Sequence, residues 1–146
     1  MRGPGRRAVR EWIVRVVLAL WAAASVQLGI WATFAPRSFY DNYPGFGREW
    51  VRVDGPYNEH LVRDFGGLNL ALAVVTIAAL ITLSRPLVIA VAIAWLAWGV
   101  PHLVYHLRHL DVFATDDKVL NVIALSVLPV LAVVVLVLTI RRPART

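Results

Sequence analysis

The stretch VLNVIALSVLPVLAVVVLVLTI, residues 119–140, contains no charged side chain. A helix rises about 1.5 Å per residue, so a bilayer core of about 30 Å takes about 20 apolar residues to cross. Three other stretches have a similar length and composition, at about 12–34, 60–83 and 87–109. The sequence therefore predicts four membrane-spanning helices.

The composition of the whole chain agrees with this interpretation. Of the 146 residues, 59% are hydrophobic and only 16% are charged, which is too little polarity for an ordinary soluble domain. The chain has no cysteine, which excludes disulfides and thiolate metal sites. A net charge of +6 is compatible with nucleic-acid binding, but no nucleic-acid motif accompanies it. The lipid bilayer is the expected partner, with a membrane protein or a second copy of the chain left open.

The breaks between the four stretches carry residues that end helices. Ser84, Arg85 and Pro86 form a tight turn between the second and third stretches, and two aspartates with Lys118 precede the fourth. Four spans joined in this way run alternately up and down. The predicted fold is an all-α, four-helix transmembrane bundle, with residues 1–146 forming a single domain.

Lysine and arginine are unevenly shared between the two sides of the predicted membrane. One side holds nine of them beside the single acid Glu11, namely Arg2, Arg6, Arg7, Arg10, Arg15, Arg85, Arg141, Arg142 and Arg145. The other side holds six, namely Arg37, Arg48, Arg52, Arg63, Arg108 and Lys118, beside eight acids. Because the positive-inside rule counts lysine and arginine in short loops, both termini are expected in the cytoplasm. We therefore expect a multi-pass protein of the bacterial inner membrane.

The N-terminal segment also has features of a cleavable secretory signal. Arginines precede an apolar run, Ala22, Ala23 and Ala24 form a small-residue stretch, and Arg6-Arg7 is similar to a twin-arginine leader. The apolar run continues to Phe34, however, which is longer than the core of a signal peptide. We expect an intact first helix, although cleavage of residues 1–24 stays open.

The only long connection, residues 35–59, is predicted to face outward. Loops of this length without evident structure are commonly functional or disordered. This one is too aromatic for a disordered linker, since it holds Phe39, Tyr40, Tyr43, Phe46, Trp50 and Tyr57. We expect a folded cap over the outer mouth of the bundle, and an aromatic belt without a pocket is the alternative.

Ionisable side chains gather on the same predicted side of the membrane as this loop. His60 and Asp64 lie one helical turn apart at the start of the second span, and His102 and His106 lie one turn apart near the end of the third. Two side chains at this spacing can bind the same ion. We therefore predict a pocket with a divalent metal held by these four residues, in which Glu59 takes a proton from the metal-bound water.

The same residues have less specific interpretations. Histidine and aspartate are ordinary residues at the polar end of a membrane helix, and His109 is expected in water. The sharper hypothesis is a metal-dependent membrane enzyme acting on a lipid-soluble substrate. Its alternative is a non-catalytic membrane subunit or assembly factor whose polar cluster is structural. A haem or quinone role, and a small channel or carrier, are further alternatives.

Three amides within the predicted spans form a separate group. Gln27, Asn69 and Asn121 each lie in an otherwise apolar stretch. Interhelical hydrogen bonds of such residues contribute about 0.6–2 kcal/mol in membranes. We expect these side chains to hydrogen-bond between helices.

Two runs of the sequence carry a resemblance to known proteins. They are SFYDNYPGFGREWVRVDGPYNEHLVRDFGGLNLALAV, residues 38–74, and GVPHLVYHLRHLD, residues 99–111, in which PYNEHLVRD and PHLVYH are the most specific parts. From about Pro36 to Asp111 the chain resembles a family of small four-span bacterial membrane proteins of unassigned function, similar in layout to DoxX-like proteins. The resemblance implies four spans. DoxX-like proteins are associated with quinone-linked redox chemistry, but no motif here carries that role to a residue.

Overall fold

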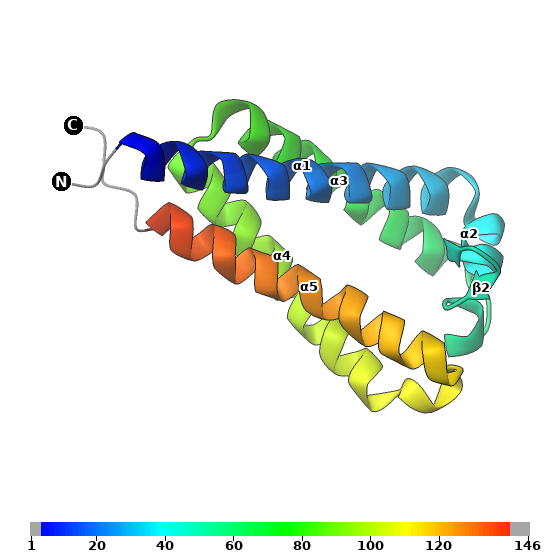
Figure 1. Ribbon diagram of the computed structural model, residues 1–146. Coiled ribbons are helices and arrows are strands. Elements are labelled where there is room, and N and C mark those ends of the chain that lie inside the picture. The colour runs from blue at the N-terminus through cyan, green and yellow to red at the C-terminus, as the bar shows by residue number, and fades with distance from the viewer. Residues whose placement is uncertain (1–3, 141–146) are drawn as a thin grey trace.

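A computed structural model describes residues 4–140 of the chain, and it is almost entirely helical (Figure 1). The elements in order are α1 (Pro4–Phe34), α2 (Pro36–Asn42), β1 (Pro44–Gly45), β2 (Arg48–Glu49), the 3-10 helix η1 (Arg52–Asp54), α3 (Glu59–Thr82), α4 (Arg85–Arg108), the 3-10 helix η2 (Leu110–Val112) and α5 (Thr115–Ile140). Four arginines of the topology count, Arg2, Arg141, Arg142 and Arg145, lie outside the described residues.

Four of the helices are long and apolar enough to cross a membrane. They are Arg7–Phe34 within α1, and the whole of α3, α4 and α5. The all-α fold with four candidate spans is thus confirmed, with boundaries within about five residues of those expected from hydropathy. Both described ends of the chain lie at one end of the bundle, and the connection between α1 and α3 lies at the other (Figure 1).

The helix boundaries follow from local chemistry. The Asn58 side chain accepts a hydrogen bond from the amide of Leu61 and so caps the first turn of α3. Leu83 ends α3 in the left-handed conformation, and its amide donates to the carbonyl of Ala79. Pro86 lies in the first turn of α4, where the missing N–H has no helical partner to lose. The two spans are therefore joined by a very short turn.

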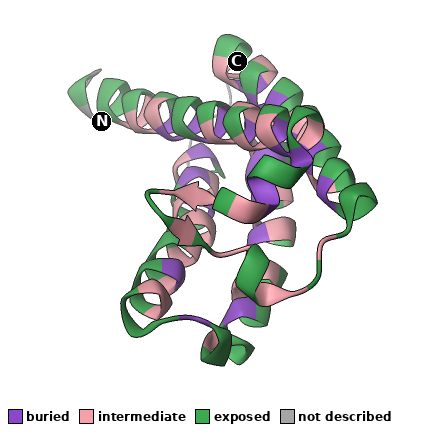
Figure 2. Cartoon of the chain, turned by 90° about the vertical axis from the view of Figure 1, so that its right-hand side faces the viewer, coloured by how far each residue is buried: buried purple, intermediate pink, exposed green. Residues whose placement is uncertain are grey.

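The four spans form two pairs. α1 lies along α3, and α4 lies along α5, whereas contacts between α3 and α4 are few although a short turn joins these two helices. The two pairs approach each other at the end that holds the termini and diverge toward the opposite end (Figure 1). Figure 2, seen from that opposite end, shows buried and exposed positions alternating on each long helix. The cap ends of the two pairs therefore lie farther apart than the ends near the termini (Figure 1).

Glycines bring α1 and α3 close together. A Cβ added at Gly29 would lie 2.7 Å from Cγ of Leu70, and one added at Gly66 would lie 2.6 Å from the backbone nitrogen of Thr33. Real Cβ atoms do not approach heavy atoms this closely, so both positions require a residue without a side chain. Small residues at a helix interface are the usual basis of tight helix association in membranes. The α1–α3 pair is therefore closely fixed in register.

The main hydrophobic core lies in the half of the bundle near the termini. The rings of Trp21 on α1 and Trp95 on α4 stack with their centroids 4.9 Å apart, and each residue is only 2% exposed. Val17, Val91 and Val135 belong to the same buried cluster. Side chains from α1, α4 and α5 thus hold the two helix pairs together at this end.

Residues 35–58 fold into a compact cap over the diverging end. Its two short strands pair antiparallel, and the hydroxyl of Tyr40 donates to the carbonyl of Gly55 at 2.6 Å. The ring of Phe39 contacts that of Trp31 on α1 and that of Phe65 on α3, each at a centroid distance of 5.6 Å. The expected folded cap is therefore present, anchored on α1 and α3 by aromatic contacts.

Candidate functional site

The structure separates the two halves of the predicted metal site. On α3, Nε2 of His60 lies 3.3 Å from a carboxylate oxygen of Asp64, and the side chains are 83% and 57% exposed. Glu59 accepts a hydrogen bond from Nε of Arg63 at 2.8 Å on the same exposed turn of the helix. These three predicted residues therefore lie on the outside of the bundle.

The two predicted histidines of α4, His102 and His106, face the interior of the bundle. His106 is 9% exposed, and its ring centroid lies 4.8 Å from that of His102, which in turn stacks on Trp98 at 4.7 Å. Both histidines line a cavity between the two helix pairs. His109 continues the row but is exposed, as expected, and its ring stacks on Tyr105 at a centroid distance of 4.1 Å.

The reason for the separation is the rotation of α3 about its own axis. Leu61, Val62 and Phe65 are the residues of α3 that line the cavity. His60 and Asp64 each precede one of them by one position, which turns a side chain by about 100 degrees on a helix. Among residues 4–140, no three His, Cys, Asp or Glu side chains come together as a group that could hold a metal. The structure thus gives no support to the expected metal site or to Glu59 as its base.

The cavity lies between the two helix pairs and beneath the cap. It has a volume of about 460 Å³ and is lined by residues from α1, the cap, α3, α4 and α5. Its wall contains seven Phe, Tyr and Trp side chains, including Trp50 of the cap, Phe65 and Trp98. Small-molecule sites are mostly apolar clefts of about 300–1,000 Å³, so this cavity has the size and the surface of a ligand site.

The cap forms one end of this cavity and is tied to both distant helices. Nε1 of Trp50 donates to a carboxylate oxygen of Asp117 on α5 at 2.8 Å, and Arg48 contacts the same carboxylate. The hydroxyl of Tyr105 on α4 donates to Asp54 of the cap at 3.3 Å. The cap therefore bridges the two helix pairs where they diverge.

Burial also raises the pKa of Tyr43, another wall residue of the cap, so that its phenol is neutral.

Polar atoms without partners distinguish the wall near the cap. Asn121 is 2% exposed, and its carbonyl oxygen has no hydrogen-bond partner among the described residues. Nδ1 of His106 is also buried without one. Both residues line the cavity. Buried polar groups are normally hydrogen-bonded, so a buried acceptor without a partner in a cavity wall indicates a site for a ligand or water.

The fate of the amides differs from the expectation of interhelical hydrogen bonds. Asn69 donates to the carbonyl of Phe65 on its own helix at 2.9 Å, which leaves it without the predicted role. Asn121 makes no such bond through its oxygen and belongs to the cavity instead. Sequence reasoning also missed Asp54 and Trp50 as wall residues. The aromatic loop was the one signal that could have indicated them, since it predicted a folded cap without saying which side chains point inward.

Comparison of the chain with family models, with curated proteins and with solved structures finds no match.

Proposed function

We propose that this protein is a membrane-embedded binding protein for a lipid-soluble small molecule. The observation that carries the proposal is the cavity of about 460 Å³ between two pairs of apolar helices, with an apolar wall and a few polar atoms near the cap. A molecule that dissolves in the bilayer can bury its apolar part against Phe65 and Trp98 and direct a polar group toward His106 and Asn121. The lipid-soluble ligand of the sequence interpretation is thus retained.

A metal and a hydrolytic reaction are not part of this proposal. The described residues contain no group of three metal-binding side chains, and the side chain of Glu59 pairs with Arg63 on the exposed face of α3. The cavity instead offers surface area and hydrogen-bonding atoms. These are the properties of a site that recognises a molecule, and they do not require a reaction.

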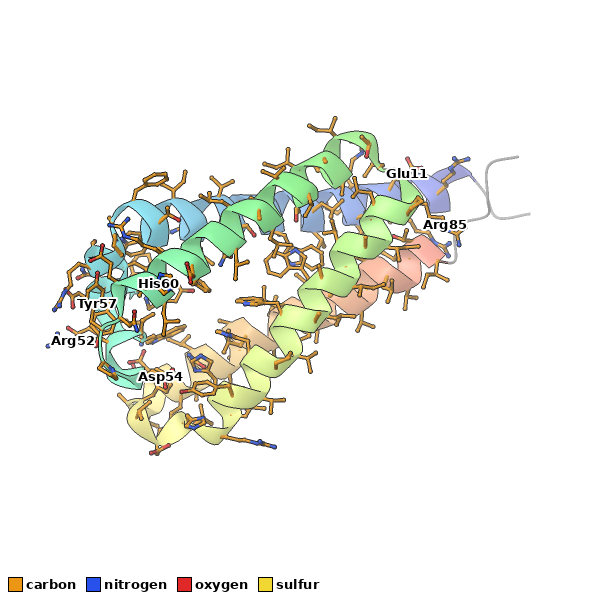
Figure 3. All side chains as sticks on the ribbon, turned by 180° about the vertical axis from the view of Figure 1, so that it is seen from behind. Glu11, Arg52, Asp54, Tyr57, His60 and Arg85 are labelled. Atoms are coloured by element: carbon orange, nitrogen blue, oxygen red, sulfur yellow. The ribbon has the colours of Figure 1, made fainter. Side chains whose placement is uncertain are left out.

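The layout of the helices supports access from the membrane. Between their short turn and the cap, α3 and α4 make few contacts, and their cap ends stand apart (Figure 3). The wall near this separation consists of apolar residues such as Leu61 and Trp98. A ligand that arrives through the hydrocarbon does not have to displace the cap. Membrane partition thus supplies part of the affinity.

The proposal is tested by filling the cavity. The full chain is placed in nanodiscs of phosphatidylcholine, and binding of the neutral aromatic alcohol naphthylmethanol is measured by calorimetry against empty discs. Ala124 lines the cavity on α5, so an indole there occupies the space, and Ala124→Trp is expected to abolish saturable binding. The matched variant Ala97→Trp, at an exposed position of α4 outside the wall, is expected to bind like the native chain.

Two results contradict the proposal. One is the absence of saturable binding by the native chain. The other is equal binding by Ala124→Trp and Ala97→Trp, because the ligand would then lie at the lipid-facing surface or outside the cavity. Circular dichroism of both variants establishes that the helices are retained.

A further inference from the structure

The charge on the cavity wall has one sign. Among the described residues that line the cavity, Asp54 is the acidic one, and there is no Lys, Arg or Glu. Its carboxylate accepts a hydrogen bond from the neutral hydroxyl of Tyr105 at 3.3 Å. The nearest arginine in sequence, Arg52, donates to Glu49 at 2.9 Å and points away from the bundle (Figure 3). The carboxylate of Asp54 thus has no cation of the chain bonded to it among the described residues.

Two of the three unpartnered atoms of the described wall add hydrogen-bond acceptors to this charge, whereas the third, Nε1 of Trp95, is a donor. The carbonyl oxygen of Asn121 is an acceptor, and the residue is nine-tenths or more buried. Nδ1 of His106, buried without a partner, accepts in one of the two neutral forms of the ring. A ligand that satisfies these atoms together with a carboxylate has to donate hydrogen bonds.

The aromatic faces of the wall favour the same kind of ligand. Tyr43, Trp50 and Trp98 all line the cavity, and Trp50 and Tyr43 lie beside each other in the cap with centroids 6.4 Å apart. The face of an aromatic ring carries negative potential and attracts cations, most strongly in Trp. A carboxylate and aromatic faces on the wall of one cavity both attract an ammonium group.

We infer that the cavity binds a lipid-soluble organic cation, an ammonium group on an apolar body, with Asp54 as its counter-ion. The inference rests on the proposed function and names the ligand class of the same site. The ammonium N–H groups donate to the acceptors of the wall, while the apolar body contacts the aromatic side chains. Fatty acids and anionic phospholipids are disfavoured ligands, because no lysine or arginine of the described wall can neutralise their charge.

Three probes that share a naphthalene ring separate charge from shape. They are naphthylmethylammonium, naphthylmethanol and naphthoate, measured by calorimetry with the full chain in neutral phosphatidylcholine nanodiscs and corrected with empty discs. The ammonium is expected to bind about tenfold more tightly than the alcohol, with naphthoate weakest. Asp54→Asn removes the charge and keeps the shape, so it is expected to bind the ammonium no more tightly than the alcohol.

The matched control is Asp64→Asn. Asp64 is also a carboxylate near the cap, but it pairs with His60 on the exposed face of α3 and does not line the cavity. This variant is expected to keep the full preference for the ammonium. Retained alcohol binding in Asp54→Asn shows that the variant is folded, so its loss of preference is then an effect of charge.

The possible outcomes separate this inference from the proposed function. Alcohol binding that is lost in Ala124→Trp, with no preference for the ammonium, overturns the cation inference alone. An ammonium preference that survives in Asp54→Asn, or naphthoate as the tightest ligand, also overturns it. If none of the three probes binds saturably, both the inference and the proposed function are wrong.

Discussion

The contact of the cap with α5 gives the sharpest prediction of this structure. Asp117 accepts a hydrogen bond from Nε1 of Trp50 at 2.8 Å and forms an ion pair with Arg48. The substitution Asp117→Ala removes both interactions at once and leaves the rest of α5 intact. Of the ion pairs and hydrogen bonds between the cap and α5 within residues 4–140, the weaker contact between Arg48 and Asp116 then remains. We expect the cap to open more often, while the four-helix fold is preserved.

The magnitude follows from the burial of the contact. Hydrogen bonds to charged groups contribute about 1.5–3 kcal/mol when protected, and exposed ion pairs contribute about 0–1 kcal/mol. The side chains of Arg48 and Asp117 are 27% and 20% exposed, so the pair lies between these limits. Losing both contacts should destabilise the closed cap by about 2 kcal/mol, which raises its opening equilibrium about 30-fold.

Amide hydrogen exchange measures this opening directly. The amide of Trp50 donates to the carbonyl of Tyr43 at 2.8 Å within the cap, so its exchange rate reports on cap opening. In nanodiscs, exchange of the cap peptide is expected to become about 30-fold faster in Asp117→Ala. Exchange in α1 and in the middle of α3 should not change.

The neighbouring residue supplies the control. The Asp116 side chain is 71% exposed and meets Arg48 at 3.3 Å, so Asp116→Ala removes an equal charge but only a weak contact. Exchange in that variant should stay within about threefold of the native rate. Equal acceleration in the two variants, or none in either, would refute the argument that Asp117 holds the cap on α5.

Three further predictions concern packing, orientation and metal content. Gly66→Ala places a Cβ against the backbone of α1 and should lower the free energy of unfolding by about 1–3 kcal/mol, measured by thermal unfolding. Gly67→Ala has open space around its Cβ and should not lower it, so equal melting temperatures of the two variants would contradict the close approach. In a chain without cysteine, Phe46→Cys in the fully exposed tip of the cap should react with a membrane-impermeant maleimide in intact cells, and Ser84→Cys in the opposite turn only after permeabilisation; the reverse pattern would overturn the predicted orientation. Metal analysis of purified protein should give the same metal content for the native chain and for His102→Ala. One metal per native chain that is lost in this variant would disprove the separation of His60 and Asp64 from His102 and His106.

The sequence did not predict which face of α3 is turned toward the bundle. The spacing of His60 and Asp64 correctly predicts that they share a face, because residues four apart lie one turn apart on any helix. The face of α3 that is buried against the bundle carries Val62 and Gly66. Each lies two positions from a predicted ligand, about 200 degrees around the helix. The spacing within one helix therefore predicts that His60 and Asp64 lie together, but it does not predict whether they face a second helix.

The buried face of a membrane helix is hard to predict because its whole surface is apolar. Helices in lipid are apolar on the lipid face as well as on the bundle face, so the pattern of hydrophobic residues does not reveal which face is buried. In α3 small residues determine which face is buried, since Gly66 can lie against α1 only when its face is turned inward. The consequence for His60 is exposure, although nothing within its own helical turn indicates it.

The sequence by itself determined the number of spans, the short turn at Ser84 and the presence of an aromatic cap. These follow from the length of apolar helix needed to cross a bilayer, from local helix-ending residues and from composition. Only the tertiary structure decided that Asp54, His106 and Asn121 share one cavity wall. They come from the cap, α4 and α5, and their proximity depends on how far two helix pairs diverge, which is set by contacts between residues distant in the chain.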